Sequence, residues 1–325
     1  MTAAARVRRR RLLAPALIAL AVTGCSSGQA VPPSAVPSSA APPSAPAPPP
    51  AVVAIPTPEP SQVGELQLPI AEYMLTPQQS AELKWLNTKK VAICMKEYGF
   101  DLPIAPAPVV SASDFLLFRR YGLTDPVSVS TWGYHLPKRD TATPRATLSP
   151  AENALLFGRD AAGKPLTSSN GQAVPAGGCQ GKVNADLGSL QPGGQGPGGG
   201  ASQLAGQTKA DSFSRSMADP RVKEVFGRWS DCLRAAGFTA PNPVEAGADL
   251  PSVKAPEPDA AEIRMAQTDV ECKARTNPVG IWFAVEADYQ KAAIARQPQA
   301  FAALKAERDA QAARLAQQIA GLPGG

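Results

Sequence analysis

Apolar side chains recur at helical spacing in one segment of the chain's second half. The positions that form this stripe are Val222, Val225, Phe226, Trp229, Cys232 and Leu233. Steps of three and four residues place such side chains on one face of an α-helix. Asp219 is a good N-cap, and Pro220 suits the first helical position. The pattern predicts an amphipathic helix that begins at Pro220.

The end of this segment resembles an earlier stretch of the same chain. The two matching segments are Cys94-Met-Lys-Glu-Tyr-Gly99-Phe100-Asp-Leu-Pro103 and Cys232-Leu-Arg-Ala-Ala-Gly237-Phe238-Thr-Ala-Pro241. In each, glycine suits the left-handed residue after a helix, phenylalanine supplies the contact that follows, and proline prevents continuation. We therefore expect two helices with the same C-terminal ending.

Further helix starts follow the same rule of a capping residue and then proline. Thr76 and Gln79 fit a capping box before the first copy, whose apolar stripe is interrupted by Lys90. Ser149-Pro150 opens a short helix that Gly158 closes. Three longer helices are expected near the C-terminus, over Asp259 to about Arg275, Pro278 to Arg296 and Pro298 to about Ala320.

Signals for strands are few. Asn170-Gly171, between Leu166 and Val174, fits a two-residue hairpin turn. Residues 127–134 alternate only weakly and suit a short helix equally well. The expected fold class is mainly α with at most a small β-hairpin, in two similar helix-containing halves joined internally by disulfides.

A glycine-rich run from Gln191 to Ala201 divides the body. We expect a first helical half over residues 63–182, a flexible loop or linker over 183–210, and a second helical half over 211–325. The sequence leaves open whether the halves share one core.

The N-terminus has the pattern of an export signal. Five arginines, all before residue 12, precede an apolar run from Leu12 to Val22 that ends in small residues. This run is too short to span a bilayer. The ending Val-Thr-Gly-Cys25 resembles the lipobox of bacterial lipoproteins, which implies a signal peptide over residues 1–24 and lipidation of Cys25. An ordinary secreted protein is the alternative, and export by the Sec or the twin-arginine route is left open.

A tether is expected after Cys25, over residues 25–62. This segment is dominated by Pro, Ala, Ser and Val. Proline excludes helices and sheet interiors, so an extended polyproline-type spacer is expected. At about 3.1 Å per residue it could reach roughly 100 Å.

The charge of the chain is nearly balanced once the leader is set aside. The sequence has 32 Lys and Arg against 27 Asp and Glu, and without the five arginines of the leader there are 27 of each sign. A strong basic field is therefore absent, which argues against a nucleic-acid partner.

Four cysteines remain besides Cys25, and an even number after an export signal favours disulfides. Three connectivities are possible. We favour Cys94–Cys179 and Cys232–Cys272, because each half then joins its own motif cysteine to a later partner. A zinc site is the alternative, but these cysteines lack the short spacing of metal-binding pairs.

Catalytic chemistry has little support in the sequence. His135 is the only histidine, and no nucleophile elbow, phosphate-binding loop or metalloprotease motif accompanies it. We therefore expect no catalytic, cofactor-binding or metal-binding residues. The aromatic residues that could line a groove, or pack in the core instead, are Trp85, Trp132, Tyr134, Trp229 and Trp282.

The repeated C-[ML]-[KR]-x-x-G-F motif resembles the C-M-R-x-x-G signature of lipoproteins of high-GC Gram-positive bacteria that have no assigned activity. The segments 170–179 and 279–286 are similar to the same group. The resemblance implies an envelope lipoprotein with paired cysteines. We expect a non-enzymatic binding or interaction module on the outer face of the cell membrane, with a wall polymer or an envelope protein as partner. A solute-binding component of a transporter and an envelope hydrolase are the alternatives.

Overall fold

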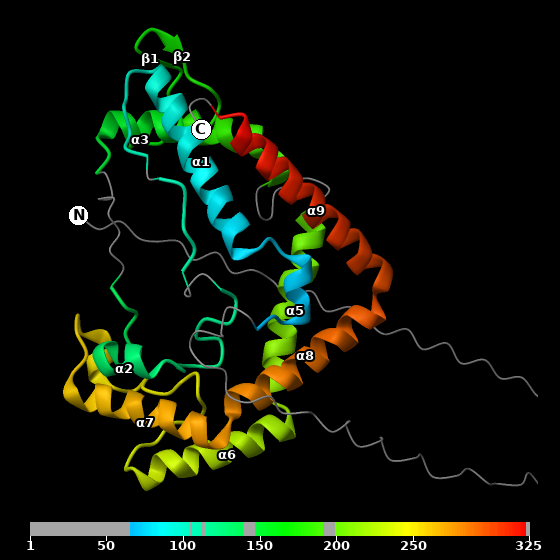
Figure 1. Cartoon of the computed structure of the whole chain (residues 1–325). Coiled ribbons are helices and arrows are strands. Elements are labelled where there is room, and N and C mark those ends of the chain that lie inside the picture. Colours follow the sequence, from blue (N-terminus) through cyan, green and yellow to red (C-terminus); the bar gives the residue numbers. More distant parts are fainter. Residues whose placement is uncertain (1–65, 105, 112–114, 139–146, 191–198, 323–325) are drawn as a thin grey trace, which may run out of the picture. The chain divides into compact units, whose positions relative to one another are not determined.

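The computed structural model describes residues 66–104, 106–111, 115–138, 147–190 and 199–322, and within them the fold is mainly α (Figure 1). The α-helices are α1 (Pro77–Glu97), α2 (Pro126–Trp132), α3 (Pro150–Phe157), α4 (Gly178–Leu187), α5 (Gly199–Met217), α6 (Pro220–Ala235), α7 (Ala260–Thr276), α8 (Pro278–Arg296) and α9 (Pro298–Ala320). Short 3-10 helices are η2 (Pro69–Tyr73), η4 (Gly188–Leu190) and η5 (Pro251–Lys254). Strands β1 (Ser168–Ser169) and β2 (Gln172–Ala173) form one antiparallel hairpin.

The two motif copies end their helices in the same way. After α1, Gly99 has a φ of 86° and the amide of Phe100 donates to the carbonyl of Met95. After α6, Gly237 has a φ of 84° and Phe238 donates to Leu233. This six-to-one bond next to a left-handed glycine is the Schellman ending. The sequence repeat is therefore a structural repeat.

The expected caps are also present. Thr76 and Gln79 form a reciprocal capping box at α1, and Ser149 and Glu152 form one at α3. Asp219 caps α6 through the amide of Arg221. Each cap accepts hydrogen bonds from amides that have no partner inside the helix.

The four cysteines of the body form two disulfides. Cys94 of α1 is bonded to Cys179 of α4, and Cys232 of α6 is bonded to Cys272 of α7. Both bonds have Cα atoms 5.7 Å apart, in the usual range. The structure thus confirms the expected disulfides and their pairing.

The two halves of the sequence share hydrophobic clusters. The first cluster contains Leu68 and Tyr121 together with Trp282 and Phe301 from much later in the chain. The second contains α1, α3 and α4 residues together with Leu315 of α9. Figure 1 shows the C-terminal end of α9 beside α1. Residues from both halves therefore pack in the same core.

A buried polar network joins the same distant segments. The carboxylate of Glu286 on α8 accepts hydrogen bonds from Arg120, Tyr121 (2.8 Å) and Ser212 (3.0 Å). Its side chain is fully buried, so these donors compensate for the lost hydration of a charge. The network fixes the segment before α2 against α5 and α8.

The expected loop at 183–210 is too long. Helix α4 continues to Leu187, and α5 begins at Gly199. Apolar positions on both helices are covered by neighbours, including Val183 and Leu187 on α4 and Ala205 on α5, and their burial stabilises helices that the glycine content argued against. The rest of the glycine-rich run, residues 191–198, lies outside the described residues, as do residues 1–24 and the tether with Cys25.

Candidate functional site

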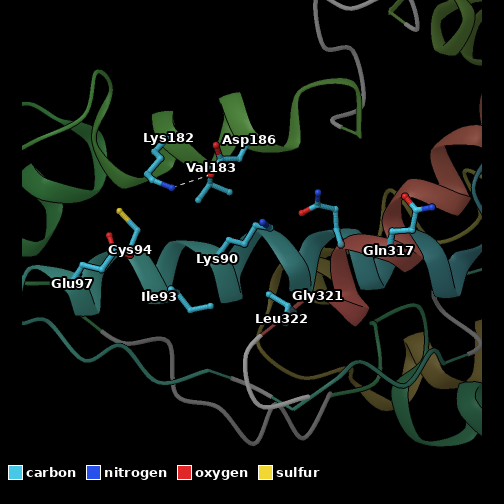
Figure 2. Close-up of a pocket in the computed structure, with 11 residues that line it drawn as sticks. Lys90, Ile93, Cys94, Glu97, Lys182, Val183, Asp186, Gln317, Gly321 and Leu322 are labelled. Carbon is cyan, nitrogen blue, oxygen red and sulfur yellow. Dashed lines mark hydrogen bonds and ion pairs between the residues drawn. The ribbon is translucent and has the colours of Figure 1, made fainter.

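A pocket of about 400 Å³ lies between α1, α4 and the C-terminal end of α9 (Figure 2). It is lined by Lys90, Ile93, Cys94 and Glu97 of α1, by Lys182, Val183 and Asp186 of α4, and by Gln317, Gln318, Gly321 and Leu322 at and just after the end of α9. The volume suits a small ligand or a short peptide segment. The pocket is therefore the candidate binding site.

Helical spacing explains the α1 wall. Lys90, Ile93 and Glu97 are three and four residues apart, so their side chains lie on one face of the helix. Lys90, which interrupts the apolar stripe in the sequence, is half-buried here. The sequence signal for this pocket is thus a charged residue, Lys90, inside an apolar stripe. The sequence alone did not identify Lys90 as a binding residue.

The wall formed by α4 is held in place by a disulfide and by a close contact at a glycine. Cys94 at the pocket is bonded to Cys179 in the first turn of α4. A Cβ at Gly178 would lie 2.2 Å from the carbonyl oxygen of Leu155, and Gly178 has a φ of 68°. Only glycine lets α4 begin this close to α3. These restraints preform the pocket.

Charges of both signs line the pocket. The ammonium of Lys182 donates to Asp186 across 3.0 Å, as Figure 2 shows. This hydrogen bond and the charge of Asp186 raise the pKa of Lys182, and the Glu97 carboxylate adds to the effect. Lys182 therefore stays positive, with two carboxylates beside it.

Other polar groups of the pocket are available to meet a ligand. Within the described residues, the side chains of Lys90, Glu97, Gln317 and Gln318 have no hydrogen bond or ion pair. They offer a cation, a carboxylate and two amides. Convergent polar groups around a preformed hollow are typical of a ligand site.

A second pocket of about 200 Å³ is mainly apolar. It is lined by residues from 66–80 and 115–117, including Leu68, Met74 and Leu116. Among the described residues that line it there is no acid and no base, and its polar side chains are those of Gln67, Thr76 and Ser80.

His135 lies away from the first pocket, between α7 and the loop before it. Its Nδ1 is 2.8 Å from Oε1 of Glu262, and its Nε2 is 2.9 Å from the carbonyl oxygen of Ala255. Glu262 is fully buried and also accepts from the backbone amide of Tyr134. The hydrogen bond to Ala255 is the largest cause that raises the pKa of His135, followed among the raising effects by the bond to Glu262. Both ring nitrogens face acceptors, which leaves neither to take a proton from a substrate.

A second buried charge pair lies deeper along α7. Lys273 Nζ is 2.8 Å from Oδ2 of Asp269, and both side chains are fully buried. Trp229 donates to the other carboxylate oxygen at 2.9 Å. Burial raises the pKa of Asp269 and lowers that of Lys273. The pair is enclosed by protein and joins α6 to α7 near the Cys232–Cys272 bond.

The aromatic residues do not gather into one groove. Trp229 and Trp282 are fully buried in different clusters, which favours packing in the core over ligand binding. Trp85 lies at the edge of the α1 cluster, beneath the ammonium of Lys89 at 4.9 Å. Trp132 likewise lies beneath the ammonium of Lys138.

Metal-binding clusters and membrane spans are not found in the described residues. These residues contain no group of three side chains able to hold a metal ion. No helix in these ranges has both the length and the apolarity that a bilayer span requires.

Comparison with known proteins does not assign the chain to a family. No family model matches the chain, and no curated protein or solved structure is significantly similar to it.

Proposed function

We propose that this protein is a membrane-anchored extracytoplasmic lipoprotein whose folded body is a non-catalytic binding module. The observation that carries the binding part is the preformed pocket between α1, α4 and α9, with the available side chains of Lys90, Glu97 and Gln317. We propose this pocket as the binding site, with a component of the cell envelope as ligand.

Two features support the location. Disulfides persist in oxidising compartments, and the chain has two, Cys94–Cys179 and Cys232–Cys272. The leader and its Val-Thr-Gly-Cys25 ending supply the anchor. Two or more acyl chains on one residue anchor a protein stably.

The chemistry around His135 supports binding over hydrolysis. A general base needs a ring nitrogen within reach of a substrate proton. Here Nδ1 faces Glu262 and Nε2 faces the carbonyl of Ala255. The mainly helical fold likewise departs from the two-lobed α/β architecture of many solute-binding components.

The anchor is tested by Cys25→Ala in the full chain. We expect the variant to leave the membrane fraction and enter the medium, whereas Cys232→Ser/Cys272→Ser serves as a control that keeps the anchor. Membrane association of Cys25→Ala at the wild-type level would overturn the lipoprotein part.

The pocket is tested by crosslinking in intact cells. A photoreactive amino acid in place of Lys90 should give a defined adduct. This adduct should form only on illumination and only when the protein is folded. The same amino acid at Lys84, an exposed position elsewhere on α1, is the matched control. Equal labelling from the two positions, or no adduct from either, would overturn the binding part.

A further inference from the structure

The available charges of the pocket are separated along one helix. Lys90 and Glu97 are seven residues apart on α1, which is two turns and about 10 Å of helix. Figure 2 shows them at different points along α1, below α4. A ligand that contacts both residues must carry opposite charges and be long enough to reach across two turns of α1.

The other charges of the pocket leave this polarity in place. Lys182 and Asp186 of α4 pair with each other and add one charge of each sign to the lining, so their charges cancel. The side chains of Gln317 and Gln318, which also line the pocket, are neutral amides. Glu97 therefore suits a cation, and Lys90, two turns earlier on α1, suits an anion.

Part of the lining is aliphatic. Ile93 lies between Lys90 and Glu97 along α1, and Val183 of α4 and Leu322 near the C-terminus add further aliphatic surface to the lining. These side chains offer a surface for small apolar groups of a ligand.

We propose that the pocket binds a short, extended peptide with a free ammonium and a free carboxylate. Glu97 receives the ammonium, and Lys90 with Gln317 receives the carboxylate. Three extended residues span about 10 Å, which matches the rise of α1 between Lys90 and Glu97. The amides of Gln317 and Gln318 can pair with peptide groups. This proposal rests on the proposed function, because it names the ligand class of the same pocket.

The test uses the full chain in detergent and saturation-transfer NMR with three probes. They are tri-alanine, N-acetyl-tri-alanine, which lacks the ammonium, and tri-alanine amide, which lacks the carboxylate. We expect tri-alanine to bind most tightly and each blocked peptide to bind about two- to five-fold more weakly, as for exposed ion pairs.

Two variants assign each charge to its partner. In Lys90→Met, tri-alanine and its amide should bind equally, and in Glu97→Gln, tri-alanine and its acetylated form should bind equally. Lys84→Met and Glu245→Gln, at exposed positions outside the pocket, should retain the wild-type preference.

Equal binding of all three probes to the wild type, or no binding of tri-alanine, would overturn the proposal. A pocket-specific adduct in the crosslinking experiment together with no binding of tri-alanine would retain the binding module and reject the peptide. Loss of the adduct would instead reject the binding module itself.

Discussion

His135 and Glu262 form an ion pair in which Nδ1 of the imidazole lies 2.8 Å from a carboxylate that has no exposure to solvent. The second ring nitrogen faces the carbonyl of Ala255. Both partners accept hydrogen bonds, so the imidazolium form, with two N–H donors, satisfies both. The Lys138–Glu257 pair lies near the same ring, and the charge of Glu257 favours the imidazolium further.

This geometry predicts that His135 stabilises the fold more at low pH. The pKa of His135 is raised in the folded state, so its stabilising effect is complete below its unfolded pKa of about 6.5 and is lost as the pH rises through the folded pKa. The free energy of unfolding of wild type should therefore exceed that of His135→Gln most at a pH of about 5.5, and the difference should shrink by a pH of about 8.5. This difference in unfolding free energy is measured by urea denaturation, with tryptophan fluorescence as the signal. A difference that stays constant with pH would contradict the prediction.

The buried pair on α7 predicts an asymmetry between single and double substitutions. Lys273→Met leaves the Asp269 carboxylate buried without its cation, which should cost about 3–5 kcal/mol of unfolding free energy. Asp269→Asn/Lys273→Met removes both charges and keeps an acceptor for Trp229, so it should be more stable than Lys273→Met alone. Thermal and urea unfolding of the variants test this, and a double variant less stable than the single one would contradict it.

The close contact between α3 and α4 predicts that one methyl group added at Gly178 strongly lowers the stability of the fold. Gly178→Ala would place a Cβ 2.2 Å from the carbonyl oxygen of Leu155 at a φ of 68°, so we expect a loss of about 3 kcal/mol or more. Gly227→Ala is the matched control, because nothing lies within 4 Å of its Cβ and alanine favours a helix interior. It should leave stability unchanged or raise it by about 0.5–1 kcal/mol. Similar stabilities of the two variants would disprove the close approach.

The two disulfides should differ in their contributions. The Cys94–Cys179 bond joins residues 85 apart in the sequence, and the Cys232–Cys272 bond joins residues 40 apart. The entropy of the closed loops predicts losses of about 4–5 and about 4 kcal/mol when each pair is changed to serine. Calorimetry of the two double variants compares them. Intact mass with and without reductant should differ by four hydrogens, and free thiols in the unreduced protein would contradict the pairing.

Much of the fold could be predicted from local signals. Proline after a capping residue marked the starts of α1, α3, α6 and α8, and glycine marked the ends of α1 and α6. These signals act through neighbouring residues, so the sequence displays them directly. The hairpin at Asn170-Gly171 was found in the same way, and Asn170 has the positive φ that such a turn needs.

Helices α4 and α5 could not be predicted from the sequence, because contacts with distant parts of the chain stabilise them. Their segments contain several glycines, which disfavour helices in isolation. The Cys94–Cys179 bond and burial of Leu187 stabilise α4. For α5, Ser212 bonds to Glu286, far along the chain. Such pairings follow from the fold as a whole.

The candidate site was hidden for a related reason. Lys90 was visible only as an interruption of an apolar stripe, and nothing near it in the sequence indicates that Gln317 lines the same pocket. Two charged residues of the pocket, Lys182 and Asp186, lie on α4, a helix that the sequence placed partly in a loop. A pocket between three helices cannot be inferred when one of them is not expected.

The position of Leu315 has a consequence for how the chain matures. This side chain of α9 is 1% exposed and packs in the same cluster as Leu83 and Leu86 of α1. A ribosome delivers α1 more than two hundred residues before it delivers Leu315. Until translation has passed Leu315, the apolar face of α1 lacks this cover. The cluster around α1 can therefore complete its native packing only after helices α2 to α8 have been synthesised.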